Sequence, residues 1–270
     1  MKKTWAFRLT LTWVLIYLGA IVALPLLAFI LSVKGLGAYE FFKLALQARN
    51  LSALELSFLC SLGAAALASI LGLLVAWVLD RYAFFGRKAL DLCVDLPLAL
   101  PTAVGGLALA GLFSPLGPLG NLCSHLGLPI AFTKLGIILA LVFTALPAVV
   151  RTLQPTLRAL DRDVEEAATC LGATRTQTFQ RVIFPQLYGA MASGFLLSFA
   201  RALAEYGSVA FISGNIPLRT ETVPVLVLAR IEQGDLASAT AVAAAHLGLA
   251  ALCLMALGTW QQRLARRGDR

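Results

Sequence analysis

The chain has 270 residues, of which 59% are hydrophobic and 13% are charged, and its formal net charge is +8. Soluble domains are roughly 45–50% apolar and about 25% charged, so this composition excludes a soluble globular protein and indicates a fold whose solvent is lipid. The basic residues lie between apolar stretches rather than among aromatic residues on one polar face, which argues against a nucleic-acid-binding protein.

Six apolar stretches predict an all-α, polytopic membrane protein with six transmembrane helices. A helix needs about 20 residues to cross the hydrocarbon core, and a backbone in lipid has to satisfy its own hydrogen bonds as a helix. The first stretch follows a basic N-terminus, as a signal peptide would, but it is too long for a cleaved signal, so we expect a retained first span. The stretches cover residues 9–33, 56–79, 90–113, 135–153, 189–213 and 237–259.

The third stretch is the least regular of the six. Pro97, Pro101 and the pair Gly105–Gly106 interrupt it, which predicts a bent or broken helix whose freed backbone faces protein or a cavity. Asp91 and Asp95 lie near its start. Because the N-terminal end of a helix favours carboxylates, we interpret these two residues as caps.

Lysine and arginine counts predict the orientation, because cytoplasmic loops are enriched in both residues. With the N-terminus inside, fifteen of them lie on the cytoplasmic side, six lie in outer loops, and Arg201 lies within the fifth stretch. We therefore expect both termini in the cytoplasm. The chain then divides into a first helix with its outer loop (1–55), a transmembrane core (56–260) with a cytoplasmic loop (151–188), and a basic tail (261–270).

The cytoplasmic loop has the pattern of two short helices joined at a glycine. An Asp-x-x-Glu pattern at residues 163–166 starts the first helix, and Gly172 ends it. A Thr-x-x-Gln pattern at residues 174–177 is a second capping box, and Pro185 marks where the second helix bends.

The first of these two helices carries a small apolar patch beside two carboxylates. Ala167, Ala168 and Leu171 form the patch, next to Glu165 and Glu166. A rigid helix of this kind can press into a groove on another protein and transmit a push to the membrane helices. The alternative is an amphipathic connector that lies on the membrane surface.

This loop resembles the Glu-Ala-Ala loop of ATP-binding-cassette (ABC) importer permeases. The family pattern has Glu-Ala-Ala, then a glycine, then an Ile-x-Leu-Pro ending. This chain has Glu-Ala-Ala at residues 166–168, then Gly172, then Val182, Phe184 and Pro185. Valine and phenylalanine replace isoleucine and leucine, and both exchanges keep an apolar side chain for packing.

Three further strings are similar to the permease subunits of the sulfate/thiosulfate ABC importers of bacteria and some algal chloroplasts. They lie at residues 95–106, 150–155, and 201–215 followed by 220–221. Molybdate permeases share much of the first and third strings. A molybdate or tungstate permease is therefore the alternative within the same family.

The resemblance implies the transmembrane domain of a type I ABC importer, in a bacterial inner membrane or alternatively in a plastid inner envelope. Such permeases work with a second permease, expected here to be a homologous distinct chain, with two copies of an ATPase subunit and with an external sulfate-binding protein. The chain contains no Gly-Lys dipeptide and hence no phosphate-binding loop, so we expect no cofactor and no catalytic residue in it, and ATP and Mg²⁺ to be used by the partner. The implied ATPase-coupling residues are Glu165, Glu166, Ala167, Ala168, Leu171, Gly172 and Pro185.

Charges within the fifth stretch suggest an anion route. Arg201 and Glu205 lie one helical turn apart, where an unpaired charge costs about 2.5–3.5 kcal/mol, so we expect them to pair with each other or with another helix. They either fix the helix packing only, or Arg201, tuned by Glu205, lines the route of a sulfate dianion, together with hydrogen-bond donors and helix N-termini. The candidate residues are Thr102, Gly105, Arg201, Glu205, Tyr206, Ser208 and Asn215.

Two other classes of function remain as alternatives. An ion-gradient-driven carrier or a channel would also use broken helices and buried charges, but it would have no need for a docking loop. An intramembrane enzyme would need a Ser, His, Asp or metal constellation within mutual reach, and the sequence suggests none. His125 and His246 have no neighbours at metal-ligand spacing, so we expect no metal site.

Overall fold

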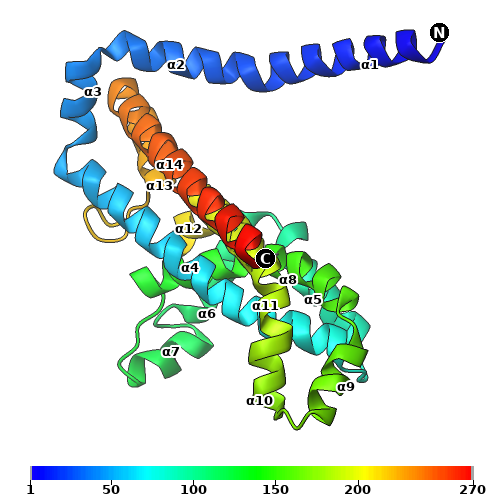
Figure 1. Ribbon diagram of the computed structural model, residues 1–270. Coiled ribbons are helices and arrows are strands. Elements are labelled where there is room, and N and C mark those ends of the chain that lie inside the picture. The colour runs from blue at the N-terminus through cyan, green and yellow to red at the C-terminus, as the bar shows by residue number, and fades with distance from the viewer. Residues whose placement is uncertain (1, 269–270) are drawn as a thin grey trace.

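The computed structural model describes residues 2–268, and its regular elements within this range are all helices (Figure 1). Short turns connect most of them. In chain order the elements are α1 (Lys2–Leu18), the π-helix η1 (Gly19–Ala23), α2 (Leu24–Leu36), α3 (Ala38–Ala45), α4 (Ala48–Arg81), α5 (Arg87–Ala99), α6 (Thr102–Phe113), α7 (Pro118–His125), α8 (Lys134–Ala159), α9 (Arg162–Cys170), α10 (Arg175–Thr178), the π-helix η2 (Phe179–Ile183), α11 (Phe184–Leu203), α12 (Gly207–Ile212), α13 (Val223–Glu232) and α14 (Leu236–Gly268).

Five helical segments of the described chain are long and apolar enough to cross a membrane, and one bent pair of helices passes the same test when its two members are combined. The bent pair is α5 with α6, and the chain bends by 108° between them. The break falls at Leu100, which is extended, and Pro101, which has no N–H to continue the helix. Five predicted spans and the break in the third are thereby confirmed, and the count is six when α5 and α6 are taken together as one span. The five single segments are Phe7–Leu36, Ala48–Arg81, Lys134–Ala159, Arg175–Leu203 and Leu236–Thr259.

The fifth span has limits that differ from the prediction of 189–213. The helix begins at Arg175, ends at Leu203 and is separated from α12 by a short break. Pro185 does not stop or sharply bend it. The helix widens into the π-helix η2 just before the proline, where the Phe184 N–H donates to the Phe179 carbonyl. This wider turn allows the helix to continue although Pro185 has no N–H to donate.

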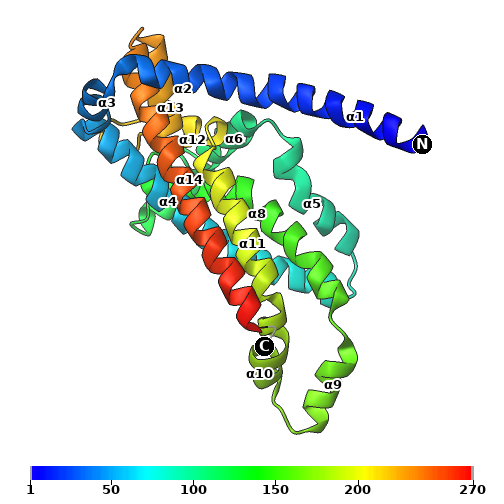
Figure 2. The same ribbon diagram turned by 45° about the horizontal axis from the view of Figure 1, so that its top comes forward.

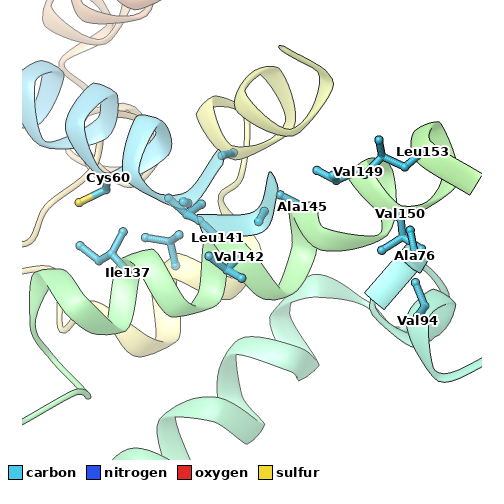
Figure 3. Packing of buried hydrophobic residues seen from close by; sticks show 14 of the residues in the cluster. Cys60, Ala76, Val94, Ile137, Leu141, Val142, Ala145, Val149, Val150 and Leu153 are labelled. Carbon is cyan, nitrogen blue, oxygen red and sulfur yellow. The ribbon is translucent and has the colours of Figure 1, made fainter. Parts of the chain in front are cut away.

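The main core of the bundle lies between α4 and α8, with α11 packed beside both. Close approach depends on glycine: a Cβ at Gly72 of α4 would lie 2.7 Å from Cγ1 of Val149 on α8, and one at Gly194 of α11 would lie 3.3 Å from the Val149 Cα. Small residues allow helices in lipid to pack this closely. Figure 3 shows the row of α8 side chains, from Ile137 to Leu153, that fills this interface.

The bundle has two distinct ends. In both views α3 and α13 lie at one end, while α9 and α10 project from the other (Figures 1 and 2). The first span, Phe7–Leu36, runs away from the bundle, and its most apolar window has no buried residue. It meets the rest of the chain where α2 approaches α3 and α14.

Candidate functional site

The projecting helix α9 begins two residues earlier than predicted. Its N-cap is Asp161, whose carboxylate accepts a hydrogen bond from the Asp163 N–H at 3.1 Å. The cap assigned to Asp163 was therefore wrong, because an Asp-x-Asp sequence offers two carboxylates and the first reaches the free N–H groups of the first turn. The helix ends as predicted at Gly172, which has a φ of +85°.

The capping box at the start of the next helix is confirmed. The Thr174 hydroxyl accepts a hydrogen bond from the Gln177 N–H at 3.3 Å, and the Gln177 side-chain oxygen accepts one from the Thr174 N–H at 2.8 Å. The turn between α9 and α10 is thereby fixed at both sides by the local sequence.

The two carboxylates of α9 have different surroundings. Glu166 is exposed, and Leu171 beside the helix end is 90% exposed. Glu166 also lines a pocket between α9 and the end of α4, together with Trp77. Glu165 instead forms an ion pair with Arg81, the last residue of α4, and the Arg81 guanidinium lies 5.3 Å from the centre of the Trp77 ring. The helix α9 is therefore anchored to the end of α4 and exposes other side chains at its own end.

An open groove of about 750 Å³ lies between α5, α8 and α11. Most of its wall is apolar, but two arginines and one glutamate reach it. The lining residues are Leu98, Pro147, Ala148, Arg151, Thr152, Leu197, Ala200, Arg201, Ala204 and Glu205.

Arg201 and Glu205 line this groove without pairing with each other. The Arg201 Nε donates to the Thr144 carbonyl on α8 at 2.8 Å, so the expected contact with another helix is the one that forms. Glu205 accepts hydrogen bonds from both the N–H and the hydroxyl of Ser208, each at 3.0 Å. Among the described residues no carboxylate pairs with Arg201, and its two terminal nitrogens are free to donate to an anion in the groove.

The second arginine of the groove forms a cluster that the sequence reading missed. Arg151 of α8 donates from Nε to Asp95 Oδ1 at 2.9 Å and from Nη1 to Asp91 Oδ1 and to Gln154 at 2.6 Å. Asp91 and Asp95 lie beyond the first turn of α5, whose N-cap is Gly86, so their interpretation as caps was wrong. The available signal was two carboxylates one turn apart in an apolar segment, which have to find a cation.

Three other candidates for the anion route, Thr102, Gly105 and Ser208, lie on α6 and α12 and are absent from the groove lining. A Cβ at Gly207 would lie 2.9 Å from the Ala103 N, next to Thr102, and one at Gly105 would meet the Phe143 ring at 2.9 Å. These positions therefore serve close packing around the broken third span.

Two further candidates flank α12. Asn215 has a φ of +51°, donates to the Ala210 carbonyl and accepts from the Ser213 hydroxyl, so it caps the end of α12. Tyr206 precedes the helix and is 41% exposed. Across residues 2–268 no group of three or more His, Cys, Asp or Glu side chains could hold a metal ion.

Comparison with known proteins matches residues 68–268 to the family described as "Binding-protein-dependent transport system inner membrane component". Two solved bacterial ABC transporter chains have the same fold. One is involved in the import of the polysaccharide alginate, with a TM-score of 0.79, 15% identity and coverage of 97% of this chain and 96% of that chain. The other is in complex with an alginate-bound periplasmic protein, with a TM-score of 0.78, 17% identity and coverage of 98% and 96%.

Curated relatives match nearly the whole chain. The sulfate transport system permease protein CysT of Synechocystis sp. is 43% identical, over 94% of this chain and 90% of its own length. The protein of the same name from Salmonella typhimurium is 40% identical, over 97% and 94%. A probable sulfate transport system permease protein from Nephroselmis olivacea is 43% identical, over 98% and 91%.

Proposed function

Because the chain belongs to the family of binding-protein-dependent transport system inner membrane components, we propose that it is the permease subunit of an ATP-driven importer of sulfate or thiosulfate. Relatives that are 40–43% identical over nearly the full chain carry the name of sulfate permeases. The single structural observation that carries the proposal is the groove lined by Arg201, whose terminal N–H groups have no carboxylate partner among the described residues.

The groove suits an oxyanion that has to be bound and then released. An arginine offers a planar fork of N–H groups that matches the oxygens of a tetrahedral anion. Glu205 lines the same groove, held by Ser208, and its negative charge limits how tightly an anion is held beside Arg201. The remaining wall is apolar and offers few competing contacts.

The exposed face of α9 is the proposed docking surface for the ATPase subunit. Its members are Glu166, Ala167 and Leu171, with Gly172 ending the helix. The ion pair of Glu165 with Arg81 supports this role, since it connects the docked helix to α4, the helix of the central core. ATP and Mg²⁺ are then handled by the partner, and this chain binds no cofactor.

The complete importer is proposed to contain two ATPase copies, a second permease that is a homologous distinct chain, and an external sulfate-binding protein. The chain resides in a bacterial inner membrane or alternatively a plastid inner envelope, with lipid around it and both termini in the cytoplasm. No nucleic acid takes part. This orientation rests on the larger number of lysines and arginines on the α9 side of the spans.

Uptake of radiolabelled sulfate by a permease-deleted host that carries this gene tests the proposal. We expect uptake to depend on ATP and to fall by about tenfold or more in Arg201→Ala, because a charged hydrogen bond contributes about 1.5–3 kcal/mol. Arg201→Lys keeps the charge and should retain part of the uptake. Arg219→Ala, a change of an exposed arginine outside the groove, is the control.

The alternatives have distinct outcomes in the same assay. If labelled sulfate does not accumulate but labelled molybdate or tungstate does, the chain is assigned to molybdate or tungstate. Uptake that persists without the ATPase subunit would point to an ion-gradient-driven carrier or a channel.

A further inference from the structure

The contacts of Arg151 hold two helices together at a place where little else does. All three guanidinium nitrogens of Arg151 donate to α5: Nε and Nη2 to Asp95, Nη1 to Asp91, and Nη2 also to the Asp91 carbonyl at 2.9 Å. The only described residues of α5 that are buried are Val94 and Pro97. Ion pairs are therefore a large part of what fixes α5 to α8.

The cluster lies along the path that an anion would take from Arg201. Arg151 and Arg201 line the same groove. Arg201 is anchored at Thr144, and Arg151 lies seven positions further along α8, which is about 10 Å or two helical turns. Because α8 leads into α9, Arg151 is on the α9 side of Arg201.

The chemistry of the cluster allows an anion to replace the carboxylates. A guanidinium binds a carboxylate pair and a tetrahedral oxyanion through the same fork of N–H groups. The side chains of Arg151, Asp91 and Asp95 are 32%, 39% and 43% exposed, and Arg151 itself lines the groove, so an anion there can reach its guanidinium. An oxyanion that leaves Arg201 can therefore compete with Asp95 for Arg151.

The fold provides a hinge for the movement that follows. The bend of 108° between α5 and α6 lies at Leu100 and Pro101, where the chain is extended and no helical hydrogen bond crosses the junction from Pro101. When Asp91 and Asp95 lose Arg151, a weaker polar contact remains, the hydrogen bond from Gln154 Nε2 to Asp91 Oδ1 at 3.2 Å. The helix α5 can then swing about the hinge and away from α8.

We propose that Arg151 is a second anion-binding residue and that its ion pairs with Asp91 and Asp95 form a gate at the α9 side of the groove, which the transported oxyanion opens by displacing the carboxylates. This inference rests on the proposed function, since it takes the groove as the anion route. It adds a residue of α8 and two residues of α5 to that route.

The test uses the complete transporter in proteoliposomes loaded with radiolabelled sulfate. The double variant Asp91→Asn with Asp95→Asn removes both carboxylate charges of the gate and leaves Arg151 in place. We expect sulfate efflux without ATP to rise several-fold while ATP-driven uptake falls. The control, Glu40→Gln with Glu55→Gln, removes two carboxylates outside the groove and should leave efflux unchanged.

Exchanging the charges of Arg151 and Asp95 distinguishes the role of the ion pair as a gate from the role of Arg151 in anion binding. Arg151→Asp with Asp95→Arg restores an ion pair but removes the cation from α8, so we expect low efflux together with low uptake. Efflux of the double asparagine variant that equals that of the unaltered complex, with normal assembly on size exclusion, would overturn the gate. If the unaltered complex carries another oxyanion, efflux is measured with that anion. Failure of the unaltered complex to transport sulfate would then contradict the proposed substrate, whereas unchanged efflux in the variants would contradict the gate.

Discussion

Gly106 shows how closely the broken third span is packed. A Cβ at this position would lie 2.5 Å from the Ser208 Cα, which is backbone and cannot rotate away. We expect Gly106→Ala to destabilise the protein by about 1–3 kcal/mol, the range of overpacked cores, and to displace Ser208, which binds Glu205 in the groove wall. The thermal unfolding midpoint in detergent and sulfate uptake measure the two effects.

Gly111→Ala is the matched control for this change. It lies on the same helix, and a Cβ there meets nothing within 4 Å. Since alanine is also the better helix former, Gly111→Ala should leave the unfolding midpoint unchanged or slightly higher. An equal loss in both variants would show that the α6–α12 contact is looser than described.

At the residue scale, most local signals were interpreted correctly, apart from the cap at Asp163 that belongs to Asp161, whereas distant partners were not found. The capping box at Thr174 and the helix end at Gly172 depend on neighbours within four positions, and both are confirmed. Arg151 lies 60 positions from Asp91, and no periodicity connects residues so far apart. The carboxylates were therefore given the nearest local role, which was capping.

At the element scale, the ion pair of Glu165 with Arg81, which anchors α9 to α4, makes a sharp prediction. Arg81→Glu places two carboxylates together and should detach α9, so that less substrate is transported per ATP hydrolysed. Adding Glu165→Arg restores an ion pair in which the two charges have exchanged helices, and this double variant should recover much of the coupling. Lys88→Glu, an equal charge change at an exposed position, is the control. Unchanged coupling in Arg81→Glu would contradict a transmitting role for this pair.

The end of α9 depends on a backbone conformation that favours glycine. Gly172 has a φ of +85°, and a Cβ there meets no atom within 4 Å, so a substitution adds strain without a clash. We expect Gly172→Val to cost about 1–2 kcal/mol locally and to shift Leu171, which reduces ATP-coupled uptake while the protein still assembles. Gly189→Ala, at a helical glycine with similar open space, should retain coupling.

Hydropathy predicted the spans because the bilayer sets their length. The same signal could not place the limits of the fifth span, since residues 204–213 are as apolar as the helix before them while the chain breaks and starts α12. The limits of such short helices depend on tertiary contacts, here the close approach of α12 to α6.

At the scale of the whole molecule, α4 joins the two ends of the bundle. It has 34 residues, with the Arg81 pair at the α9 end and, at the other, Arg49 bound to Glu221 by two hydrogen bonds at 2.7 and 2.8 Å. Glu221 is 4% exposed, so Arg49→Leu should destabilise the protein by about 3 kcal/mol, because a buried carboxylate is left unpaired. Unfolding in detergent measures this loss.

The double variant distinguishes the contribution of the ion pair to stability from the contribution of side-chain packing. Arg49→Leu with Glu221→Leu removes both charges, and we expect stability to return close to that of the unaltered protein, since apolar replacement of a buried pair is often neutral. If the double variant is as unstable as the single one, the contribution of this end of α4 comes from side-chain shape rather than from charge.

The separation of the first span from the bundle has an evolutionary consequence. A helix surrounded by lipid needs only apolar side chains, whereas Gly72 and Gly194 cannot be replaced by larger residues without a clash with α8. The match to the family begins at residue 68, beyond this helix. Mutations that exchange one apolar side chain for another should therefore accumulate fastest between Phe7 and Leu36, and divergent lineages should resemble one another least in that helix.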